Sequence, residues 1–415
     1  MIPPVLEVYV VWHPGDVAGQ GVARQIFDHF HGSGFSGLIG GAVEVYTRSY
    51  GWRTDAGAPR PVPFPGAPEC NFVREAQIVA VVPVLGNSFA NAVETGEGEW
   101  FDFSQSIAIA QRSNPSRVGV FPILLDAGAL DGTVLGQVFG RYQRIAAGGW
   151  LSEEEPTEEA RCRDLAQGIT QTILGPDARL TIFISHTKRY SGDEERDDAS
   201  SLIRLVRSIL QETRLQQFFD ASDLQPGRDW DRELRRRAGE SALLALRTDQ
   251  YASREWCQRE MLIAKRAGMP IVILDAPVLG EERGSFLMDH VPRVPVRLEA
   301  DRRKSDIRRG LNLLVDECLK RSLWDVQKAL AAGRTELGIS WWAPHAPEPI
   351  TLAQWLTESI SNGSITVGSA SLRILHPDPP LGFEEQSVLA QIAALAGQNG
   401  EVDVLTPRLL AARGV

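Results

Sequence analysis

The sequence predicts an α/β protein with two doubly wound parallel sheets in tandem, followed by a partial α/β unit. Three observations support this fold class. Short apolar runs rich in β-branched residues alternate with amphipathic stretches through residues 1–325, as expected for buried parallel strands and the helices that cover them. The order of elements in 1–174 is repeated in 177–325. After residue 325 a Pro-rich stretch precedes a shorter strand–helix alternation.

Composition and charge exclude several classes of protein. The chain has 415 residues, of which 43% are hydrophobic and 23% charged, which suits two or three ordinary globular domains. Its net charge of -10 and pI of about 5.4 disfavour direct nucleic-acid binding and binding to anionic membranes. No apolar run reaches the roughly 18 residues of a membrane span. The start "MIPPVLEVYVVWHPGD" lacks the pattern of a signal peptide, so we expect a cytoplasmic protein.

The cysteines and the standard ligand-binding motifs give no sign of a metal or cofactor. Cys70, Cys162, Cys257 and Cys318 are scattered without a CxxC pair, so neither a disulfide framework nor a zinc site is expected. The sequence has no Walker loop and no HExxH. We therefore predict no metal site and no bound cofactor.

The segment 177–325 shows the alternation most clearly. Strands are expected in 179–187, 215–220, 241–248 and 269–277, with a short edge strand in 295–300. Helices are expected in 198–213, 229–239, 253–267 and 304–324, with Asp229 and Ser253 as N-caps. Such a sheet carries helices on both faces and binds ligands at the carboxyl ends of its strands.

Residues 1–174 repeat this order of elements. The run 5–12 is an expected strand, 21–34 a helix and 41–49 a strand. The stretches 74–91, 99–112, 116–128 and 157–174 then parallel the third strand, the Trp-bearing helix, the fourth strand and the closing helix of the second segment. We interpret the two segments as a duplication, although α/β domains resemble one another in general.

The last part of the chain is shorter and less regular. Residues 326–349 are predicted to be a linker, in which Trp341 and Trp342 pack against a neighbouring domain. In 350–415, strands are expected in 370–376 and 401–407 with a helix in 382–398 between them. Two strands are too few to stand alone. This unit must therefore dock on another part of the chain, or it is the start of an α/β domain that the end of the sequence cuts short.

The helix expected over 253–267 carries a carboxylate in an unexpected position. Its apolar side chains gather on one side at about 100° per residue; they are Trp256, Cys257, Met261, Ile263, Ala264 and Ala267. Glu260 lies in the middle of this stripe, while Lys265 falls on the polar side. A buried carboxylate costs free energy unless it is hydrogen-bonded, so we expect Glu260 at the wall of a cleft. A snorkelling glutamate, or one paired with an arginine, is the alternative.

Residues 177–325 resemble a TIR (Toll/interleukin-1 receptor) domain. The resemblance rests on three stretches in order: "TIFISHTKR", "FFDASDLQPGRDW" and "YASREWCQREML". It implies the flavodoxin-like sheet of that family. In its enzymatic members, the glutamate at the position of Glu260 is the catalytic residue that cleaves NAD+ between nicotinamide and ribose. The resemblance, and not the composition, assigns that role to Glu260.

The other candidate residues each have a structural alternative. Trp256 is a candidate wall of the nicotinamide pocket or a core residue. Phe183, Ser185 and His186 end the first strand, where Ser185 and His186 are candidates to contact ribose or phosphate or simply to cap the strand. Four further candidates lie in the loop after the second strand: Asp220, Asp223, Pro226 and Gly227. The resemblance implies that this loop covers the pocket and makes TIR–TIR contacts. The same residues would also form an ordinary turn without any function.

The first segment resembles a TIR domain that has lost this chemistry. Its counterpart helix "EWFDFSQSIAIAQR" places Ser104 where Glu260 stands and Asp102 on the opposite face. Its loop after the second strand is also much longer. We therefore expect a structural or regulatory role for residues 1–174.

The leading hypothesis is an NAD+ nucleosidase of bacterial anti-phage immunity that is activated by self-assembly. NAD+ is then the substrate, and the product is nicotinamide with ADP-ribose or a cyclic ADP-ribose. One alternative is a non-catalytic scaffold or signalling adaptor. Another is an effector regulated by a nucleotide ligand at the C-terminal unit, in the manner of Rossmann-like SLOG sensors.

Overall fold

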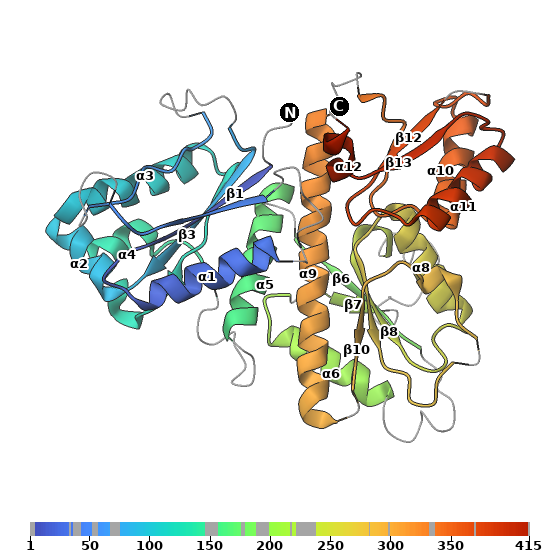
Figure 1. The fold of residues 1–415 in the computed structure, drawn as a ribbon. Helices are drawn as coiled ribbons and strands as arrows, with labels where there is room; N and C mark the ends of the chain where they lie inside the picture. Colours follow the sequence, from blue (N-terminus) through green and yellow to red (C-terminus); the bar gives the residue numbers. More distant parts are fainter. Residues whose placement is uncertain are drawn as a thin grey trace, which may run out of the picture. The chain divides into compact units, whose positions relative to one another are not determined.

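The computed structural model describes residues 5–32, 35, 43–51, 57–66, 75–145, 157–175, 179–187, 199–215, 218–220, 238–281, 283–297, 299–331, 337–368 and 371–413 (Figure 1). The chain divides into two compact units, residues 1–178 and 179–415. Each unit is described by itself below.

The first unit contains a parallel five-stranded sheet. Its strands are β1 (Leu6–Trp12), β2 (Val43–Arg48), β3 (Ile78–Leu85), β4 (Val118–Val120) and β5 (Ile123–Leu124). Their order is β2-β1-β3-β4, and β5 extends the β4 side of β3. The central strands β1 and β3 are buried at every position, as continuous apolar runs between two helical layers should be.

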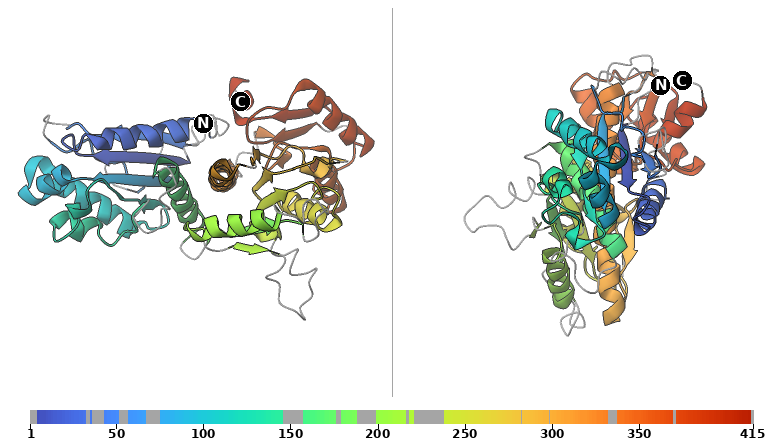
Figure 2. Two further views of the ribbon diagram at one scale, coloured as in Figure 1. Left: turned by 90° about the horizontal axis from the view of Figure 1, so that it is seen from below. Right: turned by 90° about the vertical axis from the view of Figure 1, so that its left-hand side faces the viewer.

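Helices cover both faces of this sheet (Figure 2). They are α1 (Ala18–His31), α2 (Asn87–Thr95), α3 (Trp100–Ser113), α4 (Val134–Phe139) and α5 (Thr157–Leu174), with short 3-10 turns η2 (Glu97–Glu99) and η3 (Ala127–Ala129). The helices α2, α3 and α4 share one core with Tyr9, Val11, Val79 and Val81. The helices α1 and α5 contact each other and the sheet separately. This two-sided layering is the predicted α/β architecture.

The second unit begins with another parallel five-stranded sheet. Its strands are β6 (Ile182–Ser185), β7 (Phe218–Asp220), β8 (Ala242–Arg247), β9 (Ile271–Asp275) and β10 (Arg293–Pro295), in the order β10-β9-β8-β6-β7. In chain order this is the flavodoxin-like sequence 2-1-3-4-5. The first unit has the same order over its first four strands. The predicted fold class is therefore confirmed for both units.

Residue alternation along these strands decides which side chains meet which helix. The helices are α6 (Ala199–Gln211), α8 (Glu255–Ala267) and α9 (Ala300–Ala331), with a 3-10 turn η4 (Phe286–Met288). Phe183, Leu243 and Ile273 share a core with α8. The intervening residues face α6 and α9, where Gly310 of α9 lies so close to Leu274 that a Cβ there would stand 2.2 Å from its methyl group. Ser185 is two residues after Phe183 and thus lies on the α8 side.

A third, three-stranded parallel sheet follows α9. It consists of β11 (Trp341–Trp342), β12 (Leu372–Leu375) and β13 (Val402–Leu405), paired in that order. Its helices are α10 (Pro349–Ser361), α11 (Phe383–Leu395) and α12 (Pro407–Ala412).

The predicted linker 326–349 is not a separate connector. Its first residues extend α9 to Ala331 and its tryptophans form β11. Trp341 stacks on Trp355 of α10 at 4.9 Å between ring centroids, and Trp342 packs against Trp324 of α9 at 5.5 Å. The strand β11 was not predicted because it has only two residues and lies in a Pro-rich stretch. Its two tryptophans are held by these aromatic contacts.

The loop between β11 and α10 docks the third sheet onto α8. Lys265 of α8 is 6% exposed, and its Nζ donates to a Glu348 carboxylate oxygen at 2.8 Å and to the Asp289 carbonyl at 2.8 Å. Burial lowers the pKa of Lys265, and the hydrogen bond to Glu348 opposes that shift. Glu348 is also the N-cap of α10. One carboxylate therefore joins the start of α10 to the last turn of α8.

The end of α8 is held by the same loop. The half-buried His345 ring places Nε2 at 3.2 Å from the carbonyl oxygens of both Gly268 and Met269, to which it donates. A Cβ at Gly268, where φ is +64°, would stand 2.8 Å from Pro344. The glycine thus ends α8 and admits the loop. The expectation that the C-terminal unit docks on another part of the chain is met here.

The placement of Lys265 on the polar side of α8 was wrong. A helical wheel ranks a lysine as solvent-facing because an isolated buried ammonium is expensive. Here the Glu348 carboxylate, 83 residues away in the chain, makes burial tolerable. In the described part of the chain, no helix is long and apolar enough to cross a membrane.

We expect Glu348→Ala to lower the free energy of unfolding by about 3–5 kcal/mol, because it leaves the Lys265 ammonium buried without its counter-ion. Urea unfolding of the full chain measures the loss. Glu384 is an exposed glutamate in the first turn of α11, and Glu384→Ala should cost less than about 1 kcal/mol.

A double variant separates the two roles of Glu348, which are to pair with Lys265 and to cap α10. Lys265→Met with Glu348→Gln removes both charges and keeps an acceptor for the start of α10, so it should recover most of the loss. Equal losses from Glu348→Ala and Glu384→Ala would contradict a buried ion pair.

Candidate functional site

The candidate site lies at the carboxyl ends of β6 and β8. These neighbouring strands mark the point where the strand order reverses, because the chain passes from β6 to β7 on one side and returns to β8 on the other. Open parallel sheets bind ligands outside the carboxyl ends of their strands at this switch point. Ser185 is the last residue of β6 and is in register with Ala245 of β8. It therefore lies at this switch point, at the carboxyl end of β6.

The Glu260 side chain extends from α8 to the carboxyl end of β6. Its side chain is 3% exposed, and the Ser185 hydroxyl donates a short hydrogen bond to one of its carboxylate oxygens. Ser185 Oγ lies 2.6 Å from the hydroxyl of Tyr251, which comes from the turn between β8 and α8. All three side chains are buried. The predicted inward orientation of Glu260 is confirmed.

The surroundings of Ser185, Tyr251 and Glu260 are apolar, and burial there favours the protonated forms of Tyr251 and Cys257. Burial raises the pKa of the Tyr251 phenol well above its usual value, and nearby Cys257 and Glu260 add to the shift. Burial also raises the pKa of the Cys257 thiol, reinforced by Glu260. Burial therefore favours the thiol over the thiolate at Cys257, beside Glu260.

The other strand-end residues take different positions. Phe183 is 0% exposed within the core beneath α8. His186 is partly buried, and its Nδ1 lies 2.9 Å from the carbonyl oxygen of Thr187. The structure therefore brings Ser185 to Glu260, while Phe183 packs below it in the core. Contacts of Ser185 and His186 with ribose or phosphate remain predictions.

Trp256 does not belong to the apolar stripe in which the helical count placed it. It is 47% exposed, and the guanidinium of Arg259 lies 5.3 Å from its ring centroid. It is in the first turn of α8. An exposed ring one turn before Glu260 stays a candidate for the wall of a pocket and is not a core residue.

Part of the predicted site cannot be placed. Asp220 ends β7, but its side chain lies outside the described residues, as do Asp223, Pro226 and Gly227. Their predicted roles as pocket lid and assembly contact stay predictions.

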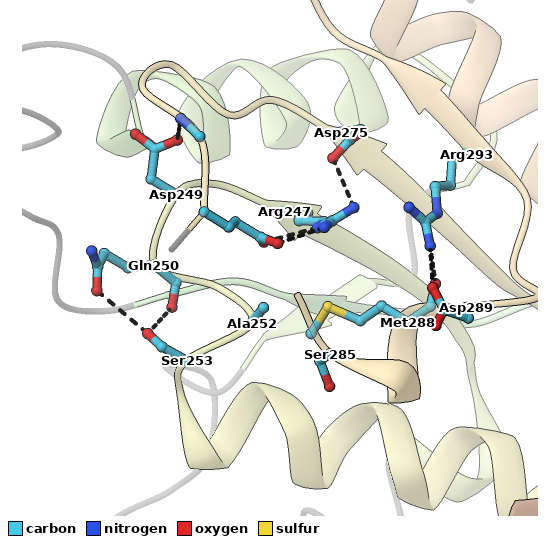
Figure 3. Close-up of polar contacts among 12 residues, drawn as sticks. Arg247, Asp249, Gln250, Ala252, Ser253, Asp275, Ser285, Met288, Asp289 and Arg293 are labelled. Atoms are coloured by element: carbon cyan, nitrogen blue, oxygen red, sulfur yellow. Dashed lines mark hydrogen bonds and ion pairs between the residues drawn. The ribbon is translucent and has the colours of Figure 1, made fainter. Parts of the chain in front are cut away.

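A polar cluster beside the site was missed by the sequence analysis (Figure 3). Arg247, the last residue of β8, donates two hydrogen bonds to Glu281 at 2.8 and 2.5 Å and lies 3.4 Å from Asp275. The Asp249 carboxylate accepts from three consecutive amides, those of Val278, Leu279 and Gly280, at 2.9–3.2 Å. These contacts fix the turn that carries Tyr251. The run "RTDQY" at the end of a predicted strand was the signal for it.

The start of α8 also differs from its predicted cap. Ser253 does not cap the helix; its hydroxyl donates to the Gln250 carbonyl at 2.9 Å, and Arg254 is the N-cap residue (Figure 3). Serine favours such local turns as readily as helix caps. The Ser253 contact therefore adds to the rigidity of the turn around Tyr251.

The first unit lacks the carboxylate at the corresponding place. Ser104 of α3 is 0% exposed and lies one turn after the buried Trp100, while Asp102 is exposed. The helical count for these residues is confirmed. Asp16 of the chain itself occupies the amides at the start of α2, because its carboxylate accepts from Ser88 and Phe89 at 2.9 and 3.0 Å. These α2 amides are not available to a bound anion.

Among the described residues, no group of three or more His, Cys, Asp and Glu side chains is placed to hold a metal ion. Cys162, Cys257 and Cys318 are buried and form no disulfide among the described residues, and Cys70 lies outside the described residues.

Comparisons with known proteins identify one part of the chain. No curated protein matches it. One similar solved structure is a "Putative sugar binding protein" from Salmonella typhimurium LT2, at 13% identity over 59% of this chain and 82% of that one, with a TM-score of 0.22. Another is tagatose-6-phosphate ketose/aldose isomerase from Escherichia coli, at 11% identity over 77% and 83%, with a TM-score of 0.19. Neither score indicates a shared fold.

The family comparison is specific where the structural one is not. The TIR domain family matches residues 182–312, which run from the first residue of β6 into α9 and include Ser185, Tyr251 and Glu260. The match falls on the flavodoxin-like sheet and on the three stretches that carry the sequence resemblance. Residues 182–312 are therefore a TIR domain, which forms the first part of the second unit.

Proposed function

We propose that the TIR domain is an NAD+ nucleosidase with Glu260 as its catalytic residue. One observation carries the proposal: a buried carboxylate, hydrogen-bonded by Ser185, lies at the switch point of a parallel sheet. Pockets at such points bind nucleotides in many α/β proteins. A charged side chain held in a buried site is a functional candidate in itself.

The reaction that fits a lone carboxylate is cleavage of the bond between nicotinamide and ribose. As that bond breaks, its electron pair leaves with nicotinamide and positive charge develops on the ribose. The Glu260 carboxylate would stabilise that charge, as carboxylates do in glycoside hydrolysis. In a site with little water, the electrostatic interaction between carboxylate and cation is strong.

No general acid is required, and the nucleophile sets the product. Nicotinamide carries a positive charge in NAD+ and leaves neutral, so it needs no proton. Water attacking the ribose gives ADP-ribose and releases one proton. An atom of the adenine of the same molecule gives a cyclic ADP-ribose. Both products remain part of the proposal.

The partly exposed Trp256 fits the proposed pocket. It stands one turn before Glu260 at the start of α8 and presents an aromatic face. Flat aromatic rings such as nicotinamide stack on such side chains. We assign it to the wall of the nicotinamide pocket, with His186 as a further contact to ribose or phosphate.

The comparison with the first unit favours chemistry over scaffolding. A scaffold has no need of an inward carboxylate, whose burial costs free energy. The first unit keeps a tryptophan and an apolar helix face but has Ser104 at this position. The fold is therefore built equally well without the carboxylate, which makes a purely structural role for Glu260 the weaker explanation.

We expect Glu260→Gln and Glu260→Ala to lower kcat for nicotinamide release from NAD+ by about 10²- to 10³-fold, because the positive charge in the transition state loses its counter-charge. The assay is chromatography of nicotinamide released by the full chain. Glu255→Gln is the matched control, since Glu255 is exposed on the same helix and its loss should leave turnover unchanged. Undiminished turnover in both Glu260 variants would contradict the proposal.

We further propose that the active form is an assembly in the cytoplasm of a bacterium, acting in defence against phage. The resemblance to bacterial TIR effectors supports this part of the proposal. Turnover per molecule should then rise with protein concentration, and sedimentation at the same concentrations should show larger species. Constant turnover across that range would contradict activation by self-assembly.

A second candidate function is regulation by a nucleotide bound to the C-terminal unit. The observation that favours it is the contact of Lys265 and Glu348, because α8 carries both Lys265 and Glu260. The loop 343–348 follows β11 at the carboxyl edge of the third sheet, where His376 and Thr406 follow β12 and β13 and are 0% exposed. A ligand at that edge would lie beside the loop that holds α8.

Hydrogen exchange of the full-length Glu260→Gln variant with cyclic ADP-ribose tests this candidate. We expect slower exchange in β12, β13 and α8, because a ligand bound at this edge stabilises the folded state. Protection confined to β6 and α8 would show binding at the TIR site alone. That outcome, or no protection at all, would contradict a sensor role.

A further inference from the structure

We propose that Ser185 and Tyr251 are positioning residues that orient the Glu260 carboxylate through a relay of hydrogen bonds. This inference rests on the proposed nucleosidase function. It changes the expected role of Ser185, which the sequence analysis assigned to substrate binding. It also adds Tyr251, which the sequence analysis did not single out.

The direction of the relay follows from counting hydrogens. A serine hydroxyl has one hydrogen and two acceptor positions. Ser185 donates that hydrogen to a carboxylate oxygen of Glu260. The 2.6 Å contact between Ser185 Oγ and the Tyr251 hydroxyl therefore requires Tyr251 as the donor. The chain runs from the phenol through the serine to the carboxylate, and each donor strengthens the next one.

The Tyr251 phenol keeps the hydrogen that it donates to Ser185 at neutral pH. Tyr251 is 0% exposed, and burial raises the pKa of its phenol, so the hydrogen that it donates is retained. The only hydrogen of Ser185 is not available to a phosphate or carbonyl of the substrate. Ser185 therefore acts on Glu260 and not on the substrate as a donor.

The phenol is anchored at the far end of the relay. The Tyr251 amide donates to the Thr248 carbonyl at 2.9 Å, and its carbonyl accepts from the Arg254 amide at 3.2 Å. The Gln258 side chain donates to the next carbonyl, that of Ala252, at 2.7 Å. Together with the Asp249 contacts, these bonds leave the turn little freedom. A fixed turn, a strand end and a helix thus converge on one carboxylate.

Orientation of this carboxylate matters because the ribose cation forms at one point. A displacement of about 1 Å can cost 10²-fold in rate. A residue that only positions Glu260 should therefore change kcat, whereas a residue that binds substrate in the ground state should change KM.

Steady-state kinetics of the full chain test the relay. We expect Tyr251→Phe to lower kcat by about 10-fold and Ser185→Ala by about 100-fold, with KM within about twofold. Ser185→Thr retains a hydroxyl and should recover most of the activity. Thr357→Ala is the control, since its exposed hydroxyl on α10 donates to the Ala353 carbonyl and is not part of the relay or of the turn around Tyr251. A rise in KM at constant kcat for Ser185→Ala would overturn the positioning role.

A second measurement keeps the relay testable if a variant is unstable or if the chain does not cleave NAD+. Melting temperatures of Tyr251→Phe, Glu260→Leu and the double variant form a cycle. The relay predicts that the drop caused by Tyr251→Phe is smaller when Glu260 is already replaced. Strictly additive drops would overturn the relay. Inactivity of the wild-type chain would overturn the nucleosidase proposal alone.

Discussion

The TIR domain is organised around one buried negative charge at the carboxyl edge of its sheet. A carboxylate in that position costs free energy unless hydrogen bonds replace its water. Ser185 supplies one such bond from β6, and its position follows from the two-residue alternation that also places Phe183 in the core beneath α8. The strand order reverses between β6 and β8, and parallel sheets bind ligands at such switch points. The strand order, the alternation of side chains along β6 and the position of residue 260 on α8 together place the Glu260 carboxylate beside Ser185.

The charge also explains why the surrounding turn is so heavily bonded. Asp249 holds three amides of the loop after β9, and Arg247 bridges Glu281 and Asp275. None of these residues touches Glu260 in the contacts described, yet they fix the turn that carries Tyr251. Catalytic groups require supporting contacts of this kind, because rotamer freedom in the supporting residues becomes misplacement at the reacting atoms.

The sequence predicted what depends on local pattern and missed what depends on distant partners. The parallel sheets and the inward phase of Glu260 follow from apolar runs and helical periodicity. Lys265 was placed on the wrong side because its partner Glu348 is distant in the chain. Trp256 was counted as apolar core because periodicity does not show which residues in the first turn of a helix are exposed. The strand β11 escaped notice because its two residues are held by Trp324 and Trp355 and not by any strand pattern.

The central claim is that Glu260 is kept for chemistry at a cost to the fold. The most direct test measures stability and turnover of Glu260→Gln in the same preparation. A neutral amide of the same shape can still accept from Ser185 and relieves the buried charge, so the melting temperature should hold or rise while NAD+ cleavage is lost. A melting temperature that falls by several degrees with turnover preserved would contradict the account, since Glu260 would then serve the fold and not the reaction.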